Sequence, residues 1–255
     1  MSSLNGRNIL LTGASSGVGL HLARNLASEG AHIFCCARRK DQLDSLVMDI
    51  HADGGSATAI TCDVTDADSI TSAFETAENI VGLVDSVIVN AGINEAGPAH
   101  SLTVKNLDQI LSVNLRGAFL TAREGASRMI KSGSPDEANP RRIVFIASIL
   151  GNRAQAGAAA YSATKAGVLM LTRSLALEWA RHQINVNAIM PGYMPTDIVA
   201  EWFDSEPGRQ QIAGWPRRKL MPVEDLDPVL MFLLSKQAQS VSGSEIKVDD
   251  TQSLA

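Results

Sequence analysis

The first thirty residues contain the pattern that most restricts the fold. A short apolar run, Asn8 to Leu11, precedes the glycine-rich stretch TGASSGVG, and apolar residues at helical spacing then continue to Gly30. This order predicts a buried strand, a tight turn and a helix. Glycine permits such a turn, and the free N–H groups of a helix start attract phosphate. We therefore predict nucleotide phosphate binding by Gly13, Ser15, Ser16, Gly17, Val18 and Gly19.

Strand-like apolar runs alternate with helical patterns along the rest of the chain. Strands are predicted at residues 31–36, 56–61, 84–89, 142–146, 184–190 and 245–248, and the longer helical stretches at about 103–131, 161–181 and 223–235. Strands separated by helices pair in parallel and carry helices on both faces of the sheet. We therefore predict an α/β fold, a single doubly wound parallel sheet (Rossmann-like) formed as one domain by residues 1–255.

Two stretches interrupt this alternation. Residues 132–140, SGSPDEANP, indicate an exposed loop, because glycine and proline break helices and strands. Residues 193–221 carry large aromatic side chains among glycines and prolines. Such a segment can form a lid over a substrate pocket or fill the core between short helices, and both interpretations stay open. Within it, Arg217-Arg218-Lys219 can meet a substrate phosphate or form a solvated charge cluster.

Composition narrows the class of partner. The 255 residues carry a formal net charge of −5 and no basic run, which argues against nucleic acid as a main partner. No stretch has the ~18 consecutive apolar residues of a membrane span, and the start lacks a signal peptide's apolar core. We expect no membrane partner and a cytoplasmic location. Cys35, Cys36 and Cys62 lie in strand-like runs without metal-ligand spacing, so we predict buried, reduced thiols and no metal site.

The end of the second predicted strand bears on the choice of cofactor. At this place a dinucleotide site has an acid for a ribose 2′-hydroxyl or an arginine for a 2′-phosphate. The chain has Ala37 followed by Arg38, which can bind a phosphate through charge-assisted hydrogen bonds. We predict a preference for NADP(H), with NAD(H) as the alternative. Arg39 and Lys40 are interpreted as solvated charges.

The chemistry is predicted on the segment from Ser148 to Lys165. Ser148 follows the apolar run 142–146, where a side chain emerges at the carboxyl edge of a sheet. Tyr161 and Lys165 are four residues apart at a predicted helix start, so their side chains share one face. An ammonium beside a phenol stabilises the phenolate and lowers the pKa of the phenol. Such a group can orient a carbonyl and deliver a proton to its oxygen.

Taken together, these motifs resemble the short-chain dehydrogenase/reductase family, in its branch of chains of this length, over nearly the whole sequence. The family's glycine motif matches residues 12–19, and its Pro-Gly that closes over the nicotinamide matches Pro191-Gly192. Thr196 stands where the family contacts the nicotinamide carboxamide, and Met194, two residues earlier, is also predicted to bind the cofactor. The other matched positions are the adenine-contacting Asp63-Val64, the sheet-stabilising Asn90-Ala91-Gly92, and the catalytic group Asn114, Ser148, Tyr161 and Lys165.

The resemblance implies hydride transfer between a nicotinamide and a ketone or secondary alcohol. It assigns proton exchange to Tyr161 and carbonyl binding to Ser148. It assigns the nicotinamide ribose to Lys165 and a water relay to Asn114. The leading reading is an NADP(H)-dependent enzyme for a mainly apolar ketone or 3-oxoacyl-type substrate, similar to 3-oxoacyl-carrier-protein reductases. The alternatives are an NAD(H)-dependent sugar, polyol or steroid-type dehydrogenase, and a non-catalytic NADP(H)-binding regulator.

The substrate residues are predicted after Ser148 and after Pro191-Gly192. These stretches supply mostly apolar walls, including Ile198 and Val199, which suit an apolar ketone better than a sugar. Asp250-Thr251 stands where relatives have Gly-Gly near a subunit interface; as in those relatives, a homotetramer or homodimer is expected. The predicted substrate-binding residues are Ser148, Leu150, Gln155, Tyr161, Tyr193 and Trp202.

Overall fold

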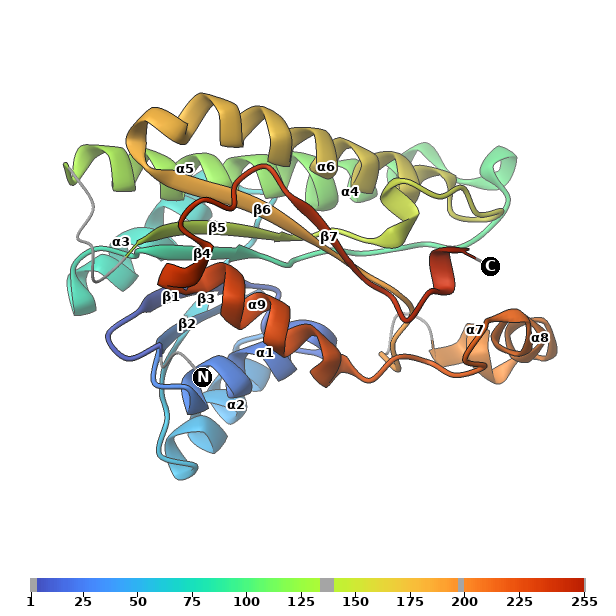
Figure 1. Cartoon of the computed structure of the whole chain (residues 1–255), viewed down its shortest axis with the longest axis horizontal. Coiled ribbons are helices and arrows are strands. Elements are labelled where there is room, and N and C mark those ends of the chain that lie inside the picture. Colours follow the sequence, from blue (N-terminus) through green and yellow to red (C-terminus); the bar gives the residue numbers. More distant parts are fainter. Residues whose placement is uncertain (1–3, 134–139, 197–199, 255) are drawn as a thin grey trace.

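The strands form one parallel sheet. The computed structural model describes residues 4–133, 140–196 and 200–254 (Figure 1). The sheet has seven strands in the order β3-β2-β1-β4-β5-β6-β7, and every neighbouring pair is parallel. The predicted doubly wound parallel sheet is therefore confirmed. The strands are β1 Asn8–Thr12, β2 His32–Ala37, β3 Ser56–Thr61, β4 Ser86–Val89, β5 Arg141–Ile146, β6 Ile184–Pro191 and β7 Glu245–Val248.

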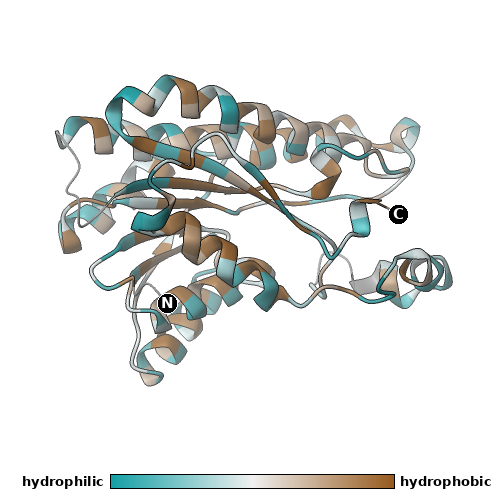
Figure 2. Cartoon of the chain, in the orientation of Figure 1, coloured by the Kyte–Doolittle hydropathy of each residue, from teal (hydrophilic) through white to brown (hydrophobic). Residues whose placement is uncertain are grey.

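Helices cover both faces of the sheet, and each face has its own apolar core (Figures 1 and 2). In Figure 2 the apolar colouring concentrates on the strands and on the helix faces that contact them. One face is covered by α1 Gly17–Ser28, α2 Lys40–Ala52 and α9 Asp227–Leu234. The other face is covered by α3 Ala67–Val81, α5 Ala118–Lys131 and α6 Ala159–Trp179, with α4 Val104–Leu111 beside them.

The order in which strands are added to the sheet reverses at β1. Strands β2 and β3 lie on one side of β1, and strands β4 to β7 lie on the other side. Parallel sheets of this kind bind ligands where the strand order reverses, at the carboxyl ends of the strands. Here side-chain bonds tie the two strand ends together. The Thr12 hydroxyl accepts hydrogen bonds from the N–H groups of Asn90 and Ala91, and Asn90 Nδ2 donates to the Thr12 and Gly13 carbonyl oxygens. The Asn90 motif therefore fixes the crevice in which the glycine turn lies.

The predicted helical region around residues 103–131 contains a break in pitch. A π-helical segment, Ser112–Gly117, separates α4 from α5 and contains Asn114. Single π-turns inside α-helices are uncommon and are frequent at functional sites. The helical periodicity of the sequence predicts the stretch, but the local change of pitch depends on the contacts that Asn114 makes.

Residues 193–221 contain two short helices, α7 Ala200–Asp204 and α8 Glu206–Gly214. The aromatic rings of Tyr193, Phe203 and Trp215 pack together, with centroids 5.1–5.6 Å apart. Phe203 and Trp215 are buried, whereas Trp202 is 45% exposed. The segment therefore combines core packing between short helices with one exposed aromatic ring. Ile198 and Val199 lie outside the described residues.

A buried ion pair lies at the amino edge of the sheet. Arg7, just before β1, contacts the Asp85 carboxylate at 2.6 Å, and both side chains are 5% exposed. Arg7 also donates to the Leu234 carbonyl oxygen at the end of α9, at 2.8 Å. The pair therefore connects β1, the start of β4 and the last helix.

Candidate active site

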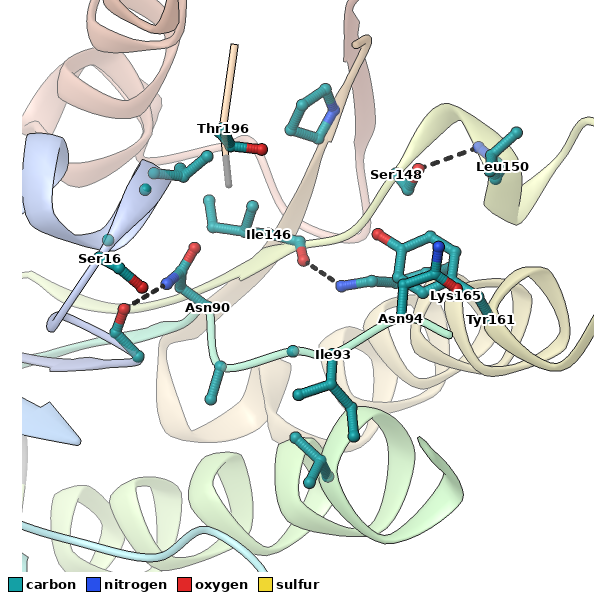
Figure 3. A pocket seen from close by; sticks show the side chains of 18 of the residues that line it. Ser16, Asn90, Ile93, Asn94, Ile146, Ser148, Leu150, Tyr161, Lys165 and Thr196 are labelled. Atoms are coloured by element: carbon teal, nitrogen blue, oxygen red, sulfur yellow. Dashed lines mark hydrogen bonds between the residues drawn. The ribbon is translucent and has the colours of Figure 1, made fainter. Parts of the chain in front are cut away.

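One cavity of about 1000 Å³ lies at the carboxyl ends of the strands. It runs from the residues after β2 to the segment after β6, and Figure 3 shows part of its wall. Every predicted site residue except Asn114 lines this cavity. The set is Gly13, Ser15, Ser16, Gly17, Val18, Gly19, Arg38, Asp63, Val64, Asn90, Ala91, Gly92, Ser148, Leu150, Gln155, Tyr161, Lys165, Pro191, Gly192, Tyr193, Met194, Thr196 and Trp202.

The glycine turn leaves the start of α1 open to a ligand. Gly13 and Gly17 have φ angles of +71° and +53°, a region that favours glycine. A Cβ at Gly19 would lie 2.1 Å from the Gly13 carbonyl oxygen, so a side chain cannot fit there. The Ser16 side chain at the N-cap accepts no hydrogen bond from the first N–H groups of α1, and no acid lies in the first helical turn. These features fit an anion at the helix start, as a dinucleotide phosphate requires.

The residues after β2 place two arginines beside this turn. Arg38 is exposed on the cavity wall, as predicted. Arg39 was interpreted as a solvated charge; it is exposed, and it also contacts the glycine turn. Its guanidinium donates to the hydroxyls of Ser15 at 2.9 Å and Ser16 at 2.7 Å. The turn after β2 runs directly beside the glycine turn, so the second arginine reaches it as well as the first, a proximity that linear spacing does not reveal.

Asp63 lies at the end of β3 on the same side of the cavity. Its Oδ1 accepts hydrogen bonds from the Thr65 N–H at 2.9 Å and the Thr65 hydroxyl at 2.8 Å. Partial burial raises the pKa of Asp63, but these hydrogen bonds and the nearby Arg38 outweigh it and hold the pKa below its ordinary value. The carboxylate is therefore a stable acceptor at the end of the cavity away from Tyr161.

Ser148, Tyr161 and Lys165 lie together at the other end of the cavity (Figure 3). Ser148 leaves the end of β5 and its Oγ accepts from the Leu150 N–H at 3.1 Å. Lys165 Nζ donates to the Ile146 carbonyl oxygen at 2.9 Å and lies 5.6 Å from the centre of the Tyr161 ring. One turn of α6 separates Tyr161 from Lys165, which confirms the predicted shared face.

The pKa of Tyr161 differs from the lowered value that the sequence predicts for a phenol beside an ammonium. Burial raises the pKa of Tyr161 to about 12, against the lowering effect of its hydrogen bond with Ser148. Burial also lowers the pKa of Lys165 to about 8. The expected lowering of the phenol pKa by the ammonium is therefore not found, because desolvation disfavours both charged forms. The site holds Tyr161 as a protonated phenol at neutral pH.

Asn114 acts on the backbone rather than on the cavity. Its Oδ1 accepts from the Ile93 N–H and its Nδ2 donates to the Ile93 carbonyl oxygen, both at 2.8 Å. Nδ2 also lies 3.3 Å from the Thr164 hydroxyl. The π-turn thus presents a buried amide whose partners are the irregular segment after Asn90-Ala91-Gly92 and the Tyr161 helix. A Cβ at Gly92 would lie 3.6 Å from both Asn114 Oδ1 and Lys165 Nζ, so both groups lie beside Gly92.

The end of the cavity beyond Tyr161 is mostly aromatic. Tyr193 stacks on Trp215 with an interplanar angle of 16°, and its hydroxyl donates to Gln155 Oε1. Trp202 lines the cavity, and its indole N–H donates to Gln211 at 2.8 Å. Asn94 also lines the cavity and was missed from the sequence (Figure 3); its Oδ1 is buried without a partner among the described residues.

One arginine of the charge cluster after α8 forms an ion pair, and the three cysteines are buried. Arg217 pairs with Asp250 at 2.9 Å. Cys35, Cys36 and Cys62 are free and buried, as predicted, and burial raises the pKa of the Cys35 thiol to about 12. Within residues 4–133, 140–196 and 200–254, no helix is long and apolar enough to span a membrane.

A glycine turn that fits a phosphate and a Ser–Tyr–Lys group on the same cavity are the features of a dinucleotide-dependent oxidoreductase. The sequence matches the family described as short chain dehydrogenase over residues 7–207. The chain therefore belongs to the short-chain dehydrogenase/reductase family, whose members act on CH–OH and C=O groups.

The matches to individual relatives cover nearly the whole chain. It is 33% identical to gluconate 5-dehydrogenase of Gluconobacter oxydans (97% of this chain, 94% of that protein). It is 32% identical to 3beta-hydroxysteroid dehydrogenase 1 of Eggerthella lenta (98% and 95%). The crystal structure of a gluconate 5-dehydrogenase from Burkholderia cenocepacia with NADP and tartrate has a TM-score of 0.92, 30% identity and coverage of 99% of this chain and 97% of that chain.

Proposed function

We propose that the protein is an NADP(H)-dependent oxidoreductase that interconverts ketones and secondary alcohols. The observation that carries this proposal is that Ser148, Tyr161 and Lys165 share one cavity with the glycine turn. A bound nicotinamide supplies or accepts the hydride. Ser148 would bind the carbonyl oxygen, and Tyr161, protonated at neutral pH, would donate its proton to that oxygen during reduction. In oxidation, the same phenol oxygen would take the proton back.

The remaining site residues would hold the cofactor and support proton transfer. The turn from Gly13 to Gly19 would bind its phosphates, Asp63-Val64 its adenine, and Pro191-Gly192 with Thr196 its nicotinamide end. Lys165 would bind the ribose. Asn114 would hold the backbone of Ile93 in place near Lys165. It would also take part in the water relay that the family resemblance implies. We also propose that residues 1–255 work as one domain, with 193–221 as the substrate segment.

The decisive experiment replaces Tyr161 with Phe. The ring would still pack, but no proton could be exchanged, and a general acid–base group contributes about 10²–10⁴-fold to the rate. We expect reduction of a ketone with NADPH to fall by that factor, while NADPH binding, followed by its fluorescence, is kept. A variant that retains more than about a tenth of the parent rate would contradict the assignment.

The preference for NADP(H) rests on charge at the turn after β2. Ala37 leaves no acid to repel a 2′-phosphate, and both Arg38 and Arg39 line the cavity there. Ala37→Asp combined with Arg38→Leu should turn the preference toward NADH, because a carboxylate binds a 2′-hydroxyl and repels a phosphate. Comparison of kcat/KM for NADPH and NADH in both proteins tests this. Equal values in the parent would contradict the proposal.

The substrate is proposed to be a medium-sized, mainly apolar ketone or a 3-oxoacyl-type compound. The support is the aromatic wall formed by Tyr193 and Trp202, while Gln155 can orient a second oxygen. Trp202→Ala should raise KM for bulky ketones more than for small ones. A panel containing ethyl acetoacetate, cyclohexanone, 2-decalone and gluconate, each with both cofactors, tests the class. Gluconate or a polyol as the best substrate would favour the sugar-type alternative, which the gluconate dehydrogenase relatives support.

Two further readings have their own tests. A steroid-type dehydrogenase using NAD(H), which the hydroxysteroid dehydrogenase relative favours, predicts turnover of a 3-hydroxysteroid added to that panel. A non-catalytic NADP(H)-binding regulator predicts NADPH binding without turnover of any member. The complete Ser–Tyr–Lys group counts against the regulator.

We further propose that the chain assembles as a homodimer or homotetramer through the outer face of α4–α6. A shallow apolar groove there is lined by Leu111, Phe119 and Met170 among others, and all three are at least 37% exposed. Exposed apolar groups gathered in this way mark interaction surfaces. Met170→Glu should lower the mass measured by light scattering, whereas Met48→Glu, also exposed but on α2, should leave it unchanged. A monomeric parent would contradict the proposal.

A further inference from the structure

A turn near the C-terminus holds the start of the substrate segment through one buried side chain. Gln252 is 1% exposed. Its Oε1 accepts a hydrogen bond from the Tyr193 backbone N–H at 2.6 Å, and its Nε2 donates to the Tyr193 carbonyl oxygen at 3.3 Å. The same carbonyl accepts from the Met221 N–H at 3.0 Å. Both ends of the segment 193–221 therefore meet at the place that Gln252 fixes.

The backbone that presents this glutamine is strained. Asp250 and Thr251 have φ angles of +51° and +65°, a left-handed conformation that residues with a side chain adopt at a cost. Such strain persists where the surrounding structure enforces it, and it is concentrated at functional positions. Here the Asp249 carboxylate accepts from the N–H groups of Thr251 and Ser253 at 3.2 and 2.9 Å. The turn is thus held closed by its own side chains.

A second contact joins the same turn to the aromatic wall. The Asp250 side chain, 10% exposed, pairs with Arg217, which follows Trp215 by two residues. Trp215 is the ring on which Tyr193 stacks, and the Tyr193 hydroxyl donates to Gln155 on the cavity wall. The turn therefore supports both members of the stacked pair. Gln252 holds the backbone of Tyr193, and Asp250 holds the segment that carries Trp215.

We propose that Gln252 is a positioning residue that sets substrate affinity by fixing Tyr193 and, through its hydroxyl, Gln155. The consequence for substrate rests on the proposed function; the fixing of Tyr193 does not. None of the described hydrogen bonds of Gln252 reaches the Ser–Tyr–Lys group. Its loss should therefore raise KM far more than it lowers kcat.

The test compares Gln252→Leu with Gln239→Leu, an exposed glutamine at the other end of β6. Hydrogen exchange followed by NMR, residue by residue, reports the Tyr193 amide directly. We expect about tenfold faster exchange in Gln252→Leu and about a tenfold higher KM for ethyl acetoacetate, the size expected when two hydrogen bonds are lost. The change in kcat should stay below about threefold, and the NADPH dissociation constant should stay within about twofold, because neither depends on those bonds. Gln239→Leu should match the parent in all four.

Two results would overturn the proposal. One is unchanged exchange at Tyr193 in Gln252→Leu; the other is a loss of kcat at constant KM, which would place the residue in the chemistry. If Gln252→Leu does not fold, Arg217→Gln replaces it, since that side chain is 65% exposed and only the Asp250 pair is lost. It should show the same two changes at about threefold, since one exposed ion pair contributes less. If the parent reduces no ketone, the proposed function fails, and the exchange result alone decides whether Gln252 fixes Tyr193.

Discussion

Lys165 illustrates how the site uses burial at the scale of single residues. Its ammonium is buried, and its pKa is lowered from 10.5 to about 8. Below pH 8 the folded and unfolded states are both protonated, and the folded state carries the full cost of the buried charge. Between pH 8 and 10.5 the unfolded state binds more protons, so the free energy of unfolding rises with pH. The lysine therefore destabilises the ligand-free fold at neutral pH.

Lys165→Met removes this dependence. Between pH 7 and pH 9.5 the parent should gain about 2 kcal/mol in unfolding free energy relative to the variant, since one pKa unit corresponds to about 1.4 kcal/mol. Urea unfolding at the two pH values measures the difference. The range stops at 9.5 because Tyr161, with its pKa raised to about 12, contributes the opposite trend above pH 10. Lys131→Met, at the exposed end of α5, is the control, and a pH-independent difference for Lys165→Met would contradict the argument.

Residue types and order predicted residues that the fold brings to one cavity, because glycines, a proline and a Tyr-x-x-x-Lys pair each have a local physical meaning. Arg39 and Asn94 could not be assigned in this way. Their roles depend on which loops meet at the carboxyl edge of the sheet. The left-handed φ angles of Asp250 and Thr251 were not predicted either, although relatives have Gly-Gly at these two positions.

At the scale of elements, α5 packs against the sheet through a glycine. A Cβ at Gly125 would lie 2.7 Å from Val87 Cγ2 and 3.3 Å from Phe74 Cζ. Gly125→Ala should destabilise the fold by about 1 kcal/mol or more, because overpacking costs ~1–3 kcal/mol and exceeds the ~1 kcal/mol gain in helix propensity. Gly214→Ala, at the end of α8 with no atom within 4 Å, is the control and should be neutral or slightly stabilising. Chemical denaturation of both variants decides between the two effects.

Periodicity predicted the strands and the main helices. It could not predict the π-turn, because the change of pitch at Asn114 depends on Ile93 and Thr164, which are distant in sequence. The short helices α7 and α8 were also left open, since helices of 5 and 9 residues carry little periodicity.

For the whole molecule, the Arg7–Asp85 pair is the contact whose loss should matter most for stability. Asp85→Asn would leave the buried guanidinium without a charged partner, and such losses cost about 3–5 kcal/mol. Asp44→Asn breaks the exposed Lys40–Asp44 pair and should cost less than about 1 kcal/mol. Thermal and urea unfolding of both variants measure the difference. Equal effects would show that Arg7 is adequately held by the Leu234 carbonyl and Ser86 alone.

The sheet keeps this ion pair and the cavity at opposite ends of its strands. Strand β1 has five residues, which at about 3.4 Å each separates the two by roughly 17 Å. Free-energy changes at sites so far apart, without shared partners, are expected to be additive. A substitution in the substrate wall that lowers stability can therefore be compensated by a stabilising substitution at the amino edge. The second substitution would leave the new substrate specificity unchanged. The length of the strands thus allows the substrate specificity and the stability of the enzyme to change independently.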